Sequence, residues 1–328
     1  MTNSTLPLRA RQKVYVTAIL QGNPVMMMGC KLLKQHAPSN FTIVKVPEEA
    51  DIVLYLENGY LGLGELPRLI DRVRAAPSAM HFMFSESDWP FPVLPGAYPS
   101  LSKTVSWAHS WCYLSALERE RANGAQGSRY VEPDLLFSFL GRTATHQIRR
   151  KMLVLDTLNT PCLDVEDGPK RFSHFDYSQT YVEIIRRSKF VLCPRGIGTS
   201  SLRIFEAMSF GRVPVVISNK WQAPPGIPWS EFCVLVPERN VVAIPEILYN
   251  LERKSFSMGE RALRVYYDYF GPKVFFDRLL SALVSKYANR SLTTAAMMQR
   301  AWQAIGWREI RTICQQARTF KLGWSSRL

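Results

Sequence analysis

The chain lacks most features of secreted, membrane-spanning and zinc-binding proteins. Its 328 residues include six cysteines, which are far apart and form no Cys-x-x-Cys pair, so we expect buried thiols rather than disulfides or a zinc site. The N-terminus has no long apolar segment, and no run of roughly 18 apolar residues occurs, so neither a signal peptide nor a membrane-spanning helix is expected. These absences favour a globular protein of a reducing compartment, and we expect a cytoplasmic location.

The chain also has far fewer acidic than basic side chains. The chain has 41 Lys and Arg against 27 Asp and Glu, a net charge of +14. Such a balance suits any polyanionic partner, whether a nucleotide, a nucleic acid or an anionic lipid. The apolar fraction of 47% allows an ordinary globular core, and the length suggests about two domains.

The order of the predicted elements indicates an α/β protein. Short apolar runs alternate with helical patterns, which predicts parallel sheets joined by crossover helices. The predicted strands lie at residues 14–20, 41–46, 51–56, 80–85, 135–141, 161–165, 189–193, 213–218 and 232–236. A polar, glycine-bearing segment at residues 118–134 divides them into two series, which predicts domains at 1–130 and 131–290 and a basic helical tail at 291–328. A ligand is expected in the cleft between the domains, at the carboxyl ends of the strands.

The most informative segment is FVLCPRGIGTSSLRIFEAMSFGRVPVVIS, residues 190–218, which reads as strand, loop, helix and strand. Ser200 or Ser201 is a natural N-cap for a helix predicted at residues 202–210. The first amides of that helix lack internal partners and would attract an anion. Gly196 and Gly198 would let a phosphate approach the loop backbone closely.

Three charged side chains could complete a nucleotide site there. Arg195 and Arg203 offer guanidinium groups to phosphate, and Glu206 can accept hydrogen bonds from two adjacent ribose hydroxyls. Alternatively, the loop is an ordinary turn, and Arg203 and Glu206 form an exposed pair on the helix. The segment has no Walker lysine, Ser201 replaces the third glycine of the dinucleotide fingerprint, and no acidic residue ends the next strand, so a P-loop or NAD site is not indicated.

The same residues resemble the exostosin family of glycosyltransferases. The similarity lies in SKFVLCPRG, residues 188–196, and in Ser201-x-Arg203-x-x-Glu206-Ala207-x-x-x-Gly211-x-x-Pro214-Val215, and it covers residues 135–251. It implies a GT-B architecture, in which two Rossmann-like domains face each other across a cleft and the second holds a nucleotide sugar, commonly a UDP-sugar. It also implies an inverting, metal-independent transfer with Arg195, Arg203 and Glu206 at the donor and Arg142 as a further candidate. Because animal members carry a membrane anchor that this chain lacks, the resemblance suggests a soluble bacterial member active in polysaccharide biosynthesis.

Sugar transfer with inversion needs a base near the acceptor hydroxyl. Glu86 and Asp88 follow the predicted strand at residues 80–85 and would face the cleft, although each could simply belong to a polar turn. Fixed cations would stabilise the departing diphosphate in place of a metal, so no metal or cofactor beyond the donor is expected. The expected partners are a nucleotide sugar and a glycan or other hydroxyl acceptor, without nucleic acid.

The basic tail leaves further interpretations open. Residues 294–328 combine three tryptophans with arginines, and such a helix can lie on an anionic membrane, which would place the protein at the inner face of the membrane. The tail could equally pack back on the first domain. Two alternative functions also remain at this point: a basic protein that binds nucleic acid, and a catalytically inactive module of the same fold that binds a nucleotide or sugar.

Overall fold

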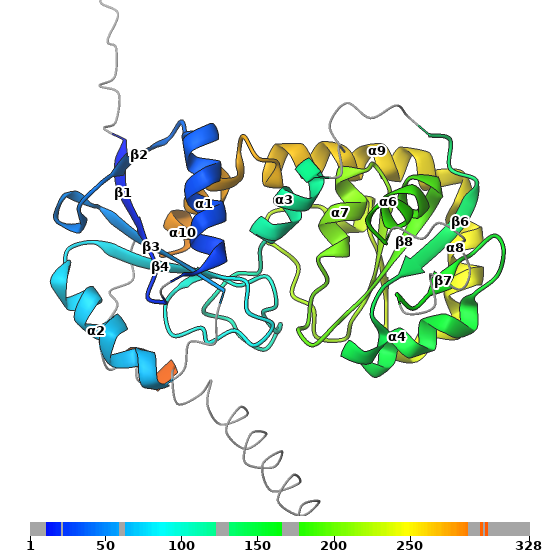
Figure 1. The fold of residues 1–328 in the computed structure, drawn as a ribbon, viewed down its shortest axis with the longest axis horizontal. Helices are drawn as coiled ribbons and strands as arrows, with labels where there is room; N and C mark the ends of the chain where they lie inside the picture. The colour runs from blue at the N-terminus through cyan, green and yellow to red at the C-terminus, as the bar shows by residue number, and fades with distance from the viewer. Residues whose placement is uncertain are drawn as a thin grey trace, which may run out of the picture.

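The computed structural model describes residues 11–20, 22–58, 63–122, 131–165, 177–287, 296–297 and 299–300. These residues form two α/β halves side by side, each built on a five-stranded sheet (Figure 1). Every ladder between neighbouring strands is parallel. The expectation of two Rossmann-like domains with helices toward the C-terminus is confirmed.

The first sheet has the strand order β2-β1-β3-β4-β5. Its strands are β1 (Gln12–Thr17), β2 (Phe41–Val44), β3 (Ile52–Glu57), β4 (Met80–Ser85) and β5 (Gly96–Ala97). Helices α1 (Pro24–Gln35) and α2 (Leu66–Ala75) belong to this half. Helix α1 has no counterpart among the predicted elements, although it carries a start signal: the Asn23 side chain accepts hydrogen bonds from the first amides, and proline follows it.

The second sheet has the strand order β10-β9-β8-β6-β7. Its strands are β6 (Leu135–Leu140), β7 (Cys162–Leu163), β8 (Ser188–Pro194), β9 (Val213–Ile217) and β10 (Val234–Val236). Its helices are α4 (Gln147–Met152), α6 (Tyr177–Arg187), α7 (Arg203–Ser209) and α8 (Ile244–Leu251). Short 3-10 segments lie at Pro47–Glu49, Leu63–Glu65, Thr143–Thr145, Leu153–Leu155, Trp229–Glu231, Glu238–Ala243 and Glu252–Lys254.

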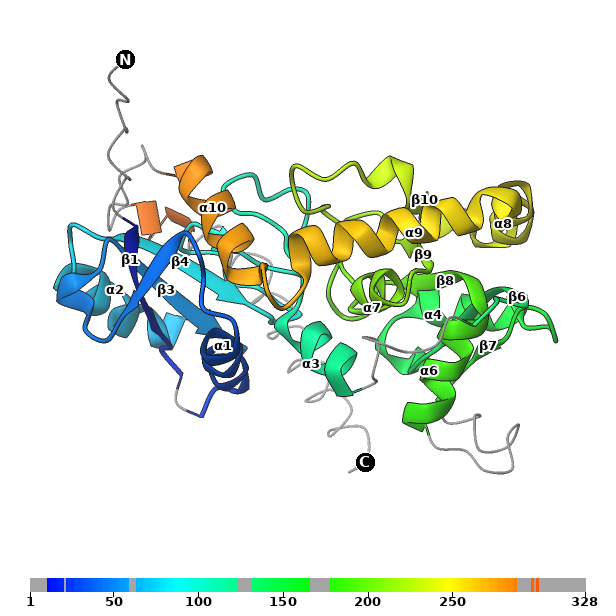
Figure 2. The ribbon, with the colours of Figure 1, turned by 90° about the horizontal axis from the view of Figure 1, so that it is seen from above.

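The chain passes between the halves twice. Helix α3 (Leu114–Ala122) lies between α1 and α7, and helix α9 (Ser255–Val265) leads through a π-helical turn, Tyr266–Phe270, to α10 (Phe275–Tyr287). Figure 2 shows α10 lying over the first sheet, where Phe275 packs edge-on against Phe84 and the Tyr287 hydroxyl donates to the Trp107 carbonyl. The segment assigned from the sequence to the second domain therefore returns to the first. The sequence pattern after residue 241 is helical without a break, so it does not predict where the chain returns to the first half.

The start of the predicted tail lies against the first half. Met297 is 1% exposed within that half's core, and the Arg300 guanidinium reaches the Val93 carbonyl. Residues 301–328, which include the tail's tryptophans, lie outside the described residues. Within the described ranges, no helix combines the length and apolar character needed to cross a bilayer.

Candidate functional site

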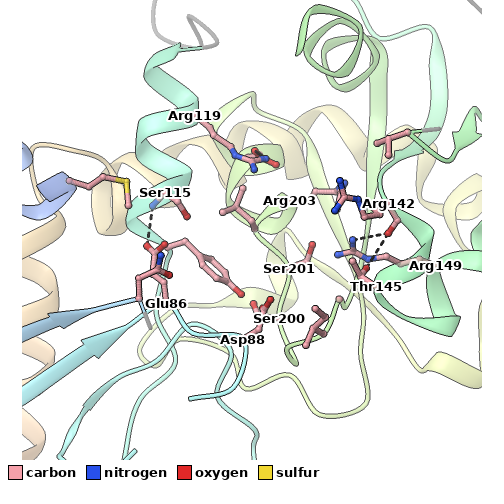
Figure 3. A pocket seen from close by; sticks show the side chains of 18 residues that line it. Glu86, Asp88, Ser115, Arg119, Arg142, Thr145, Arg149, Ser200, Ser201 and Arg203 are labelled. Carbon is pink, nitrogen blue, oxygen red and sulfur yellow. Dashed lines mark hydrogen bonds and ion pairs between the residues drawn. The ribbon is translucent and has the colours of Figure 1, made fainter. Parts of the chain in front are cut away.

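A cavity of about 670 Å³ lies between the two halves, within the size range of small-molecule sites. Its walls come from the carboxyl ends of strands in both sheets. Glu86 and Asp88 follow β4, whereas Arg142 follows β6 and Gly196 follows β8. Figure 3 shows the two acids on one side of the cavity and Arg142, Arg149 and Arg203 on the other. One wall is therefore acidic and the other basic.

Glu206 lies at this cavity and is only 3% exposed. Its Oε1 atom receives a hydrogen bond from Arg119 Nη1 at 3.3 Å, and its Oε2 atom accepts one from the Tyr181 hydroxyl. The alternative of an exposed helical pair with Arg203 is therefore wrong. A buried, ionisable acid at an interdomain cavity is instead suited to hold a polar ligand.

Arg203 also lines the cavity. Its Nε and Nη2 atoms donate to the Leu140 carbonyl at 3.1 and 2.7 Å, and the guanidinium lies 5.2 Å from the ring centre of Phe139. Gly141 makes room for this arrangement, because a Cβ atom there would stand 2.2 Å from Arg203 Nη2. The backbone and the ring together fix the guanidinium beside the cavity.

The predicted serine N-cap is wrong. Helix α7 begins at Arg203 with Leu202 in the N-cap position, and no side chain caps it. The Ile204 amide bonds to the Ser201 carbonyl, but the Ser201 hydroxyl accepts no hydrogen bond from the first turn of the helix. Ser200 and Ser201 nevertheless line the cavity and are each 4% exposed. The Ser201 hydroxyl has no hydrogen-bond partner among the described residues, which makes it a candidate ligand contact.

Arg195 lies apart from the cavity wall. Its guanidinium bends back on its own loop and donates to the carbonyls of Gly196 and Ile197. Arg195 is not among the residues that line the cavity, whereas Gly196 and Ile197 are. In this structure the Arg195 guanidinium therefore does not line the cavity, whereas that of a neighbouring arginine does.

That neighbour is Arg149, which sequence reasoning missed. It lines the cavity and is 9% exposed. Its Nε, Nη1 and Nη2 atoms donate to the carbonyls of Arg195, Arg142 and Pro194, at 3.0, 3.3 and 3.4 Å. Arg149 therefore ties the turn after β6 to the loop after β8. In the sequence it belongs to the basic run of residues 149–151, and no local pattern distinguishes it from a solvent-exposed arginine.

Gly198 lies where the second half meets the first. A Cβ atom at Gly198 would stand 2.3 Å from Ser100 Oγ and 2.8 Å from Asp88 Oδ1. The neighbouring Thr199 hydroxyl bonds to the carbonyls of Ser100 and Leu101, at 2.8 and 2.9 Å. A glycine is therefore required at this contact between the halves, and its approach to a phosphate stays a prediction. The sequence carries no signal for this contact.

The two candidate bases have different surroundings. Glu86 is partly buried, and this desolvation raises the pKa of its carboxyl group to about 7, although its Oε1 atom accepts the Ser115 amide at 3.0 Å. Loss of hydration also raises the pKa of Asp88, but the charge of Arg149 and hydrogen bonds from the Gly198 amide and the Ser100 hydroxyl oppose the rise. Glu86 is thus the better tuned for proton transfer near neutral pH.

Possible metal-ligating side chains are scattered over the described part of the chain. Within those residues, no three His, Cys, Asp or Glu side chains cluster as metal ligands. Asp164, at the end of β7, accepts hydrogen bonds from the Thr143 amide and hydroxyl. It therefore stabilises the turn after β6.

Comparison with known proteins shows a family to which part of the chain is similar. Residues 109–251 match the family model of the Exostosin GT47 domain. This segment is similar to the exostosin GT47 domain. The family resemblance predicted from the sequence is confirmed, and the domain includes α3, Arg149 and Glu206, whereas Glu86 and Asp88 precede it.

Curated relatives align with about a third of the chain. An Exostosin-1 homolog of Caenorhabditis elegans is 32% identical over 114 residues, which are 34% of this chain and 30% of that protein. The probable beta-1,4-xylosyltransferase IRX10 of Arabidopsis thaliana is 33% identical over 107 residues, which are 32% of this chain and 24% of that protein. The exostosin GT47 match thus spans less than a third of either relative's length.

Solved structures align with much of the chain at low similarity. An alpha1,3-fucosyltransferase crystal structure is 13% identical, with a TM-score of 0.45 over 86% of this chain and 92% of that chain.

Proposed function

We propose that this protein transfers a sugar from a nucleotide-sugar donor, a UDP-sugar in particular, to a hydroxyl group of a glycan acceptor. The observation that carries the proposal is Glu206, a buried acid at an interdomain cavity within an exostosin GT47 domain. Its two oxygen atoms suit the adjacent hydroxyls of a ribose. The buried Ser201 hydroxyl offers a further polar contact in the same cavity.

The basic wall suits the diphosphate of the donor. Arg142, Arg149 and Arg203 line it, and guanidinium groups bind phosphate oxygens through charge-assisted hydrogen bonds. As the bond between the sugar C1 atom and the diphosphate oxygen breaks, the electron pair stays with the diphosphate. Fixed cations stabilise that charge without the reorganisation that water would require. We therefore propose a transfer that needs no metal ion.

The acidic wall suits the acceptor. We propose that Glu86 removes the proton from the acceptor hydroxyl while its oxygen forms the new bond to C1 from the face opposite the diphosphate. The configuration at C1 is then inverted. Asp88 lies against the loop of the second half, so we assign it to positioning that loop. Peripheral membrane contact through residues 294–328 stays a prediction from the sequence.

A panel of nucleotide sugars tests this function. Thermal shift and release of free nucleotide diphosphate would be measured for each donor, with and without glycan acceptors. We expect Glu206→Ala to weaken binding of the preferred UDP-sugar by about 1.5–3 kcal/mol in calorimetry, as for a hydrogen bond to a charged group. Glu246→Ala, which changes an exposed acid on α8, is the matched control.

Three outcomes separate the alternatives. Binding with turnover supports the transferase. Binding of UDP without turnover on any acceptor would indicate an inactive module of the same fold. Steep salt-dependent binding to random DNA, with no nucleotide-sugar affinity, would favour the nucleic-acid protein suggested by the net charge.

A further inference from the structure

Helix α3 joins the two halves beside the cavity. It packs against α1 of the first half and against α7 of the second (Figures 1 and 2). Its position means that a shift of one half relative to the other moves α3 as well. Both walls of the cavity are therefore mechanically connected through this helix.

The first turn of α3 holds the proposed base. The Ser115 amide donates to Glu86 Oε1 at 3.0 Å. Amides in the first turn of a helix have no partner inside the helix and carry a partial positive charge. The backbone of α3 therefore fixes where the Glu86 carboxyl group stands.

One turn later, the same helix reaches the proposed ribose acid. Arg119 Nη1 lies 3.3 Å from Glu206 Oε1, in an ion pair whose arginine side chain is 56% exposed and whose acid is buried. Ser115 and Arg119 are four residues apart, so they share one face of α3, and both line the cavity. Figure 3 shows Arg119 extending from the helix into the cavity.

We infer that α3 holds Glu86, on the acceptor side of the cavity, at a fixed position relative to Glu206, on the donor side. Arg119 is the positioning residue that connects the helix to Glu206. The inference rests on the proposed function. A carboxylate offers about four acceptor positions. Arg119 and Tyr181 use one on each oxygen of Glu206, so a ribose diol can take the others while the ion pair persists. A donor bound at Glu206 thereby holds Glu86 where the acceptor oxygen must lose its proton.

The expected effect falls on turnover more than on donor binding. Without Arg119, the second turn of α3 loses its ion pair with α7, and we expect Glu86 to shift with the helix. A misplacement of about 1 Å in a reacting group can cost roughly 100-fold in rate. We expect Arg119→Met to lower kcat by about 10- to 100-fold while the Kd for UDP changes by less than about threefold. Arg119→Lys, which keeps the charge, is expected to recover part of the loss.

The pH profile gives a readout that a purely structural role would leave unchanged. The Ser115 amide favours the ionised form of Glu86, so weakening this contact raises the pKa of the carboxyl group further. The acid limb of the rate profile is therefore expected at higher pH in Arg119→Met. The titratable and charged groups that line this part of the cavity are Glu86, Asp88, Tyr113, Arg119 and Arg149. Only Arg119 is replaced in the variant.

A second ion pair of α3, with a lysine of α1, offers a matched control. Lys31 Nζ of α1 pairs with Glu118 Oε1 of α3 at 3.2 Å, so Lys31→Met removes an ion pair of α3 that does not involve the second half. We expect wild-type turnover and an unshifted pH profile for this variant. Thermal unfolding of both variants checks that each one folds as the wild type does. If the effect of Arg119 passes through Glu206, the loss of kcat in the double variant R119M/E206Q should be smaller than the sum of the losses in the two single variants, expressed as free energies.

The outcomes separate the two proposals. A wild-type protein that turns over no nucleotide sugar would overturn the proposed function and this inference together. With an active wild type, the inference alone is overturned if Arg119→Met keeps its kcat and pH profile. It is likewise overturned if Lys31→Met loses as much turnover, or if kcat and UDP affinity fall in equal proportion.

Discussion

Replacing Glu86 by glutamine should remove turnover and at the same time stabilise the protein. Desolvation raises the pKa of this carboxyl group from its ordinary value of 4.5 to about 7, so folding disfavours its charged form. Glutamine keeps the shape of the side chain, and its oxygen can still accept the Ser115 amide. The substitution therefore removes the ionisable group and leaves most of the packing intact.

The effect on turnover follows from the role of a base. A positioned general base contributes about 100- to 10,000-fold, so kcat of Glu86→Gln should fall by that factor. In the wild type, the rate should rise as Glu86 loses its proton and level off above a pKa of about 7. This acid limb should be absent in the residual activity of the variant.

The effect on stability has a definite sign. Between pH 4.5 and 7 the folded state binds a proton that the unfolded chain has released, so the free energy of unfolding of the wild type falls as pH rises through this window. The full difference is on the order of 3 kcal/mol, and screening of a partly exposed side chain reduces it to about 1–2 kcal/mol. Glu86→Gln should therefore be more stable than the wild type by about 1–2 kcal/mol at pH 8, with the advantage absent at pH 4.

Urea unfolding at pH 4 and pH 8, with nucleotide release measured across the same range, tests both parts. Glu246→Gln, which changes an exposed acid on α8, should alter neither. Glu86 is not the base if Glu86→Gln keeps more than about a tenth of the wild-type kcat with the same acid limb. Its carboxyl group is not held in the neutral form by burial if the variant is less stable than the wild type at pH 8.

Three further substitutions test the framework of the site. Gly198→Ala should destabilise the protein by about 1–3 kcal/mol in urea unfolding, because its Cβ atom would collide with Ser100; a change as small as that of Gly64→Ala, which has open space around it, would contradict this. Gly141→Ala should weaken UDP binding about tenfold in calorimetry by displacing the Arg203 guanidinium, and unchanged affinity would separate Arg203 from the donor. Arg149→Lys keeps the charge but cannot donate to three carbonyls, so it should lower the free energy of unfolding by about 1–3 kcal/mol; a wild-type unfolding curve would refute the linking role.

Local sequence patterns predicted much of the second half. The strands at residues 135–141, 189–193 and 213–218 agree with β6, β8 and β9 within one or two residues, because continuous apolar runs mark buried parallel strands. Arg203 and Glu206 could be recognised together because they lie within one helical turn. The family likeness followed from the same contiguous segment.

The tertiary structure decided how distant segments meet at the cavity. Arg119 and Glu206 are 87 residues apart, and no local period links them. The same applies to Arg149, whose partners lie on two separate loops, and to Gly198, whose neighbours belong to the other half. Helix α10 returned to the first sheet within an unbroken helical pattern. The sequence by itself determined the main strands of the second half and the family motif, since these depend on residues close in the chain. Only packing between distant segments determined which side chains complete the site.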